Sequence, residues 1–212
     1  MKLFLASEAK HPESIKKLKD FVGGNWKNLK IAYIPTANNG ENPFNDWEIN
    51  SAIWKLVLTL GAKITPVQLE DYKNSSVIDQ LKHKDILWFA GGSSGYLLYW
   101  IRRCEVDKAL PDLLTNSIYV GSSAGSMICS KTQYSSEWYL GEPEPGAGLL
   151  PGLGLIDFEI YPHYEDELLP QIKKFWKNGE LYLLKNGEVI TVVNNEIKIL
   201  GEKRVLKDGN LI

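Results

Sequence analysis

Short apolar segments alternate with amphipathic helical segments through the first two-thirds of the chain, and this alternation is the strongest constraint on its fold. Apolar runs that predict strands lie at 2–6, 30–35, 62–67, 85–90 and 117–121. Segments with apolar residues at helical spacing lie between them, at 12–22, 45–61, 76–84 and 94–116. Apolar strands that alternate with helices predict a mostly parallel sheet covered by helices on both faces.

The C-terminal part of the chain has a different pattern. After a helical segment around 168–176, residues 180–212 are rich in strand-forming residues with turn signals at "KNGE", "VNNE", "LGEK" and "KDGN". We interpret these residues as antiparallel strands that finish one edge of the sheet. The expected fold is therefore an α/β three-layer sandwich, a single domain over residues 1–212, since no linker-like segment divides the chain.

Composition and charge exclude several classes of function. The 24 basic and 26 acidic side chains give a net charge of −2, so no electrostatic attraction to nucleic acid or to an anionic membrane is expected. The apolar runs are far shorter than a membrane span, and the first is also too short for a signal peptide. No group of residues has metal-ligand spacing, and the two cysteines do not make a disulfide framework. We expect a cytoplasmic monomer or homodimer without a metal or other cofactor.

The sequence "YVGSSAGSMI", residues 119–128, contains the strongest candidate for a catalytic nucleophile. Residues 121–125 fit G-x-S-x-G with Ser123 at the centre, after a predicted strand and before a predicted helix. In such an elbow the chain turns sharply and exposes the central serine, while the following N–H, here that of Ala124, can stabilise an oxyanion. The alternative is a Gly/Ser turn without chemistry, because the pattern alone is weak.

A serine nucleophile needs a general base, and the chain has three histidines to choose from. His11 and His83 lie in polar segments and are expected at the surface. His163 follows the apolar segment "FEIY" and precedes a helix, which is where parallel α/β sheets carry their sites. His163 is therefore the predicted base. A candidate for the group that orients it follows in the sequence, among Asn186, Glu188 and Glu196.

Four segments in the same order resemble peptidase family S51, the dipeptidase E and cyanophycinase group, whose fold is similar to class I glutamine amidotransferases. These segments are "FAGGSSGYLL", "YVGSSAGSMI", "LGLIDFEIYPHY" and "LYLLKNGEVITVVNNEIKILG", and the resemblance spans nearly the whole chain. It implies that Ser123 is the nucleophile and His163 the base. It also implies that the N–H groups of Gly92 and Ala124 form the oxyanion hole.

The third member of the triad departs from the family pattern. The family has an acid in a short turn before the closing strands, and the aligned residue here is Asn186. An asparagine can accept a hydrogen bond from the imidazole and hold its tautomer, but it adds no charge. A shift of two residues would bring Glu188 into this role instead. The register of residues 190–192 favours Asn186, and Glu188 is the alternative.

The implied function is hydrolysis of dipeptides or short peptides near the N-terminus, through an acyl-enzyme and with a small peptide as the partner. Two alternatives are an esterase or amidase with other substrates and a catalytically weak homologue that binds peptides. The segment "YEDELLPQIKKFW" lacks the arginine of the family's aspartyl dipeptidases, so the sequence does not predict a preference for N-terminal Asp. Glu142 or Glu144 could bind a peptide amino group, although the composition of their segment is more typical of a surface connection.

Overall fold

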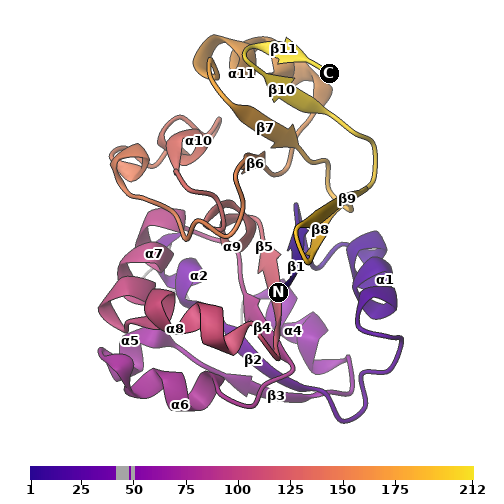
Figure 1. The fold of residues 1–212 in the computed structure, drawn as a ribbon, viewed down its shortest axis with the longest axis vertical. Coiled ribbons are helices and arrows are strands. Elements are labelled where there is room, and N and C mark those ends of the chain that lie inside the picture. Colours follow the sequence, from indigo (N-terminus) through magenta and orange to yellow (C-terminus); the bar gives the residue numbers. More distant parts are fainter. Residues whose placement is uncertain (42–47, 49–50) are drawn as a thin grey trace.

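A seven-stranded sheet forms the centre of the protein in the computed structural model, which describes residues 1–41, 48 and 51–212 (Figure 1). The strand order is β3-β2-β4-β5-β1-β8-β9. The first five strands in this order are parallel, and β8 and β9 are antiparallel to their neighbours. The strands are β1 (Lys2–Ala6), β2 (Lys30–Ile34), β3 (Lys63–Pro66), β4 (Ile86–Phe89), β5 (Ile118–Ser122), β8 (Val189–Val193) and β9 (Glu196–Leu200).

Helices cover both faces of this sheet, which confirms the predicted three-layer α/β arrangement. In β1, Leu3 and Leu5 pack on one face and Phe4 and Ala6 on the other, as the two-residue period of a strand requires. The Leu3 face is covered by α5, α6, α7 and α8, and the Phe4 face by α1 and α4. The helices are α1 (Pro12–Phe21), α2 (Thr36–Glu41), α4 (Ala52–Leu58), α5 (Leu69–Tyr72), α6 (Ile78–Leu81), α7 (Ser94–Arg103) and α8 (Val106–Leu113).

The helix predicted over 45–61 is shorter in the structure. Helix α4 begins at Ala52, and the Ser51 side chain accepts a hydrogen bond from the N–H of Trp54 at its start. Of the predicted N-terminal part of this helix, residues 45–47, 49 and 50 lie outside the described residues. Over the described ranges, no helix has the length and apolar character that crossing a bilayer requires.

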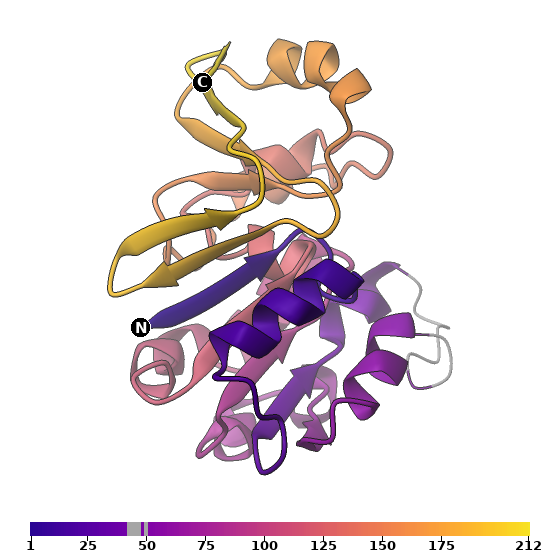
Figure 2. The ribbon, with the colours of Figure 1, turned by 90° about the vertical axis from the view of Figure 1, so that its right-hand side faces the viewer.

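A second, four-stranded sheet corrects one expectation about the C-terminal residues. Only β8 and β9 finish the edge of the main sheet (Figure 2), while the other strands form a separate sheet in the order β11-β10-β7-β6. Alternating apolar residues show which face of a strand is buried but not which strand is its partner, so the sequence did not separate the two sheets. The elements around this sheet are α10 (Tyr134–Glu137), β6 (Glu159–Tyr161), α11 (Leu169–Phe175), β7 (Glu180–Leu183), β10 (Val205–Lys207) and β11 (Asn210–Leu211).

The segment before His163 also belongs to this second sheet. Strand β6 pairs in parallel with β7 and not with any strand of the main sheet. Figure 1 shows the second sheet beyond the end of β5 at which the chain enters α9 (Ala124–Met127). The carboxyl ends of β1, β2, β4 and β5 meet at this same edge of the main sheet. Residues from both sheets therefore come together there.

Candidate active site

The turn between β5 and α9 holds Ser123 in a strained conformation. Its φ and ψ angles are 49° and −114°, which lie outside the regions that non-glycine residues ordinarily occupy. The flanking glycines leave no room for a side chain. A Cβ atom at Gly121 would lie 2.6 Å from the Gly125 oxygen, and one at Gly125 would lie 2.3 Å from the Phe89 oxygen. The glycines of the motif are thus required by the close approach of three backbone segments.

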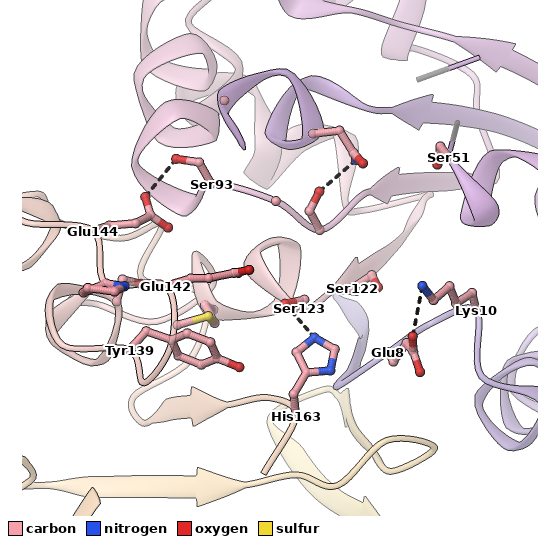
Figure 3. Close-up of a pocket in the computed structure, with 17 residues that line it drawn as sticks. Glu8, Lys10, Ser51, Ser93, Ser122, Ser123, Tyr139, Glu142, Glu144 and His163 are labelled. Carbon is pink, nitrogen blue, oxygen red and sulfur yellow. Dashed lines mark hydrogen bonds and ion pairs between the residues drawn. The ribbon is translucent and has the colours of Figure 1, made fainter. Parts of the chain in front are cut away.

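The side chains of Ser123, His163 and Asn186 follow one another in a row of contacts. His163 Nε2 lies 3.1 Å from Ser123 Oγ, and His163 Nδ1 lies 2.7 Å from Asn186 Oδ1 (Figure 3 shows the first contact). His163 follows β6 with a φ of 53°, and Asn186 lies in the turn between β7 and β8. The structure therefore brings together the predicted nucleophile, the predicted base and Asn186, the first of the three candidates for the third position.

A buried serine that the sequence analysis missed contacts all three of these residues. Ser7 follows β1 and is fully buried. Its hydroxyl accepts a hydrogen bond from the His163 N–H at 2.8 Å and donates one to Asn186 Oδ1 at 3.3 Å. Its carbonyl oxygen accepts a hydrogen bond from the Ser123 N–H at 3.2 Å. The only signal in the sequence was its position at the end of a strand, which many residues share.

The hydrogen bonds of Ser7 determine which way the Asn186 amide faces. A backbone N–H can only donate, so the His163 N–H uses Ser7 as an acceptor and leaves the hydroxyl hydrogen for Asn186. If the amide were turned over, this buried hydrogen would lose its acceptor, which costs about 1–3 kcal/mol. Asn186 therefore presents its oxygen to the imidazole. His163 Nδ1 carries the hydrogen, and the Nε2 lone pair faces the Ser123 hydroxyl.

Glu188, the alternative candidate, is engaged elsewhere. Its carboxylate forms an ion pair with Arg204 at 2.7 Å, and their side chains are 13% and 8% exposed. It also accepts hydrogen bonds from the N–H groups of Lys185 and Glu202. Burial raises the pKa of Glu188, but the hydrogen bonds from Arg204 and the two N–H groups outweigh it, so the pKa lies below its usual value. This geometry ties the turn before β8 to the segment that leads into β10.

The two N–H groups predicted for an oxyanion hole lie on the same side of the sheet edge as Ser123. Gly92 has a φ of 132°, and a Cβ atom there would lie 2.2 Å from the Ala37 oxygen. The Asn38 side chain donates a hydrogen bond to the Gly91 oxygen at 2.8 Å. Because the peptide is planar and trans, this bond also fixes the direction of the Gly92 N–H. Within the described chain, the Gly92 and Ala124 N–H groups donate to no protein acceptor.

Ser122, the other serine of the motif, has a structural contact. Its hydroxyl is buried and accepts a hydrogen bond from the Ala9 N–H at 3.0 Å. The remaining histidines lie away from Ser123: His11 caps the start of α1 through a hydrogen bond from the Glu13 N–H, and His83 is exposed. Among the described residues, no group of three or more His, Cys, Asp or Glu side chains could hold a metal ion.

Ser123 and His163 open into a cavity of about 720 Å³. Among the described residues, its acidic and basic side chains are three glutamates and one lysine, Glu8, Glu142, Glu144 and Lys10. Gly91 and Gly92 line it together with Ser93, and Tyr139 lies on the side of the second sheet (Figure 3). The cavity has the size of a small-molecule site and places a hydroxyl, an imidazole and free N–H groups around one space. This arrangement suits acyl transfer to a serine.

Comparisons with known proteins agree with one family. The model of peptidase family S51 matches residues 3–200. An uncharacterized peptidase of Listeria monocytogenes is 23% identical over 202 residues, which cover 92% of this chain and 96% of that protein. Peptidase E of a Nostoc species is 22% identical over 204 residues, 90% of this chain and 79% of that protein.

Solved structures share the fold. A putative peptidase E from Listeria monocytogenes superposes with a TM-score of 0.74 at 22% identity, covering 93% of this chain and 96% of that one. A peptidase from an acI-B1 actinobacterium gives a TM-score of 0.65 at 17% identity, covering 100% of this chain and 96% of that one. Each of these two similarities therefore covers most or all of the chain, including residues of the main sheet and of the second sheet.

Proposed function

Because this chain belongs to peptidase family S51, we propose that it is a serine peptidase that hydrolyses dipeptides or short peptides near their N-terminus. The observation that carries the proposal is the 3.1 Å contact between Ser123 Oγ and His163 Nε2 at the edge of the cavity. The strained elbow at Ser123 supports it, because strain of this kind gathers at functional sites.

In the proposed reaction, Ser123 attacks the carbonyl carbon of the scissile bond while His163 Nε2 takes the hydroxyl proton. The N–H groups of Gly92 and Ala124 stabilise the negative charge on the carbonyl oxygen. His163 then gives its proton to the leaving amine, which leaves an acyl group on Ser123. Water then attacks the acyl group in the same way, with His163 taking its proton, and releases the acyl group from Ser123. Asn186 holds His163 in the tautomer that this reaction needs, and Ser7 holds Asn186.

One observation favours a second candidate, a weak homologue that binds peptides. Asn186 is neutral and cannot stabilise the imidazolium by charge, which a carboxylate in its place would do. Labelling with a fluorophosphonate probe separates the two candidates, because the probe reacts with an activated serine. We expect labelling of the wild-type protein but not of Ser123→Ala. Absence of labelling in the wild type would favour the binding protein.

The same Ser–His pair could act on non-peptide substrates, as an esterase or amidase would. Hydrolysis of a dipeptide panel, compared with simple esters and amides, tests this point. Higher kcat/KM for dipeptides supports the proposed function, and higher values for the esters support the alternative.

Substitution of Asn186 should lower activity, whereas substitution of Glu188 should lower stability. Asn186→Ala should lower kcat roughly 10²- to 10⁴-fold with little change in KM, because Asn186 orients His163 and does not line the cavity. Asn186→Asp keeps an acceptor oxygen and adds a charge, so it should be at least as active as the wild type. Loss of kcat in Glu188→Gln at a temperature where the variant is folded would contradict this assignment.

Glu188→Gln should instead lower the free energy of unfolding, by about 1–3 kcal/mol at neutral pH, since it removes the charge that faces buried Arg204. The pKa of Glu188 is lowered by folding, so its contribution is complete above the usual value of 4.5 and is lost as the pH falls through the lowered value. Denaturant unfolding at several pH values should show the wild type and the variant converging in acid.

A further inference from the structure

Among the described residues, three carboxylates line the cavity, and two of them already have partners. Glu8 forms an ion pair with Lys10 at 3.1 Å. Glu144 accepts hydrogen bonds from the Ser93 and Ser94 hydroxyls and from the N–H groups of Ser94 and Gly95, at the start of α7. Within the described part of the chain, Glu142 has neither a hydrogen bond nor an ion pair. It is therefore the carboxylate of this cavity with capacity for a ligand.

The loop that carries Glu142 is held in place on both sides. Glu144 fixes it to α7, and the Glu144 N–H donates to the Ser136 oxygen at 2.9 Å. On the far side, the Glu137 carboxylate accepts hydrogen bonds from the N–H groups of Gly146 and Gly148, both at 2.9 Å. These contacts follow Glu142 in the chain, and before it the Leu140 N–H donates a hydrogen bond to the Tyr161 hydroxyl at 3.2 Å, so the loop is anchored to α7, α10 and β6.

Glu142 points from this loop into the cavity, toward Ser123. Figure 3 shows its side chain extended between Ser93 and Tyr139, with its carboxylate directed at the elbow. Lys10 and Glu8 lie on the opposite side of Ser123 in the same view. A substrate whose carbonyl carbon meets Ser123 would therefore have Glu142 on one side of the scissile bond and the Lys10–Glu8 pair on the other.

We propose that Glu142 binds the protonated amino terminus of the substrate, so that the first peptide bond is the one placed at Ser123. This proposal rests on the proposed function and assigns its substrate class, peptides with a free and unmodified amino end. In such a peptide the ammonium group is separated from the first carbonyl carbon by a single Cα atom. A carboxylate directed at the nucleophile suits that short separation, and a lysine side chain would carry its charge much farther away.

The charge of the cavity adds a consequence for the first side chain. Three glutamates face one lysine in the lining, so a second acidic group on the first residue would lie among like charges. Binding of the amino group by Glu142 does not depend on which side chain the first residue has. Peptides with a neutral first residue should therefore be better ligands than peptides that begin with Asp or Glu.

Binding to protein that cannot turn over tests the proposal separately from the reaction. Calorimetry with Ser123→Ala should give tight binding of Ala-Phe and at least roughly tenfold weaker binding of N-acetyl-Ala-Phe. Adding Glu142→Gln should weaken the binding of Ala-Phe about 10- to 100-fold and leave that of the acetylated peptide unchanged. Glu167→Gln is the matched control, since Glu167 is exposed and outside the cavity lining, and it should keep the wild-type preference.

Equal binding of both peptides to Ser123→Ala, or a preference that survives Glu142→Gln, would overturn the assignment. The rate of fluorophosphonate labelling reports on the proposed function alone, because the probe has no amino group. A wild-type protein that is not labelled but shows the Glu142-dependent preference would refute the serine peptidase and keep the amine site.

Discussion

Replacing Ser123 with alanine should lower kcat roughly 10⁴- to 10⁶-fold, and His163→Ala should do nearly the same. The reason is that the hydroxyl and the imidazole act as one unit, joined by the 3.1 Å contact between Oγ and Nε2. An alkoxide cannot form without a proton acceptor, and the imidazole has no proton to take without the hydroxyl. The double variant should therefore be no slower than either single variant. Dipeptide hydrolysis, followed by release of the free amino acids, measures all three.

Ser122→Ala is the matched control for these variants. Ser122 lies in the same turn, but its hydroxyl accepts the Ala9 N–H and does not contact His163. This variant should lose about 1–3 kcal/mol of stability, because a buried N–H loses its partner, and it should keep its kcat where it is folded. If the losses of Ser123→Ala and His163→Ala multiplied in the double variant, the two side chains would be acting independently and the proposed mechanism would be wrong.

Gly92→Ala should damage both stability and activity. The φ of 132° is strained for any residue with a side chain, at a cost of about 1–3 kcal/mol, and the new Cβ would lie 2.2 Å from the Ala37 oxygen. Since that oxygen belongs to backbone, the Gly91–Gly92 peptide must move to relieve the clash. The Gly92 N–H then leaves its position, and loss of one oxyanion donor costs roughly 10²- to 10³-fold in kcat.

Gly24→Ala separates the two effects. Gly24 also has a positive φ, 84°, but a Cβ atom there would meet nothing within 4 Å. This control should lose stability without losing kcat. Thermal unfolding and steady-state kinetics on both variants provide the comparison. A Gly92→Ala protein that is folded and fully active would exclude the Gly92 N–H from the oxyanion hole.

The sequence was sufficient to predict the main sheet because its strands are local features. In a mostly parallel sheet, helices cover both faces of each strand, whichever strands lie beside it. The alternation of apolar runs and helical segments alone therefore indicated three layers. The second sheet was not predictable in the same way. Strands β7 and β8 are separated by a short turn, yet they belong to different sheets, and neither pattern indicates which partner it takes.

In the candidate site, too, residues in local patterns could be predicted, and residues whose role depends on strand order could not. Ser123 was a candidate because its motif is contiguous, and His163 because the chain has only three histidines; the structure places their side chains 3.1 Å apart. Ser7 was missed because its role depends on strand order. Strand β1 lies between β5 and β8, which places Ser7 beside Ser123 and near Asn186, and no local pattern encodes that order. Asn186 and Glu188 are two residues apart in one turn, and the register of residues 190–192 favoured Asn186. In the structure Asn186 contacts His163, whereas Glu188 pairs with Arg204.

The site takes its parts from both sheets, and this has a consequence for the newly made protein. Ser123 and its elbow belong to the main sheet, whereas His163 follows β6 of the second sheet and Asn186 lies in the connection between the two. A chain that has been made only as far as residue 150 contains the proposed nucleophile and the Gly91–Gly92 segment but neither the proposed base nor its partner. Chains broken off at that stage would carry no hydrolytic activity. The candidate site can therefore form only after residues 159–193 have been made and the second sheet has packed beside the main sheet.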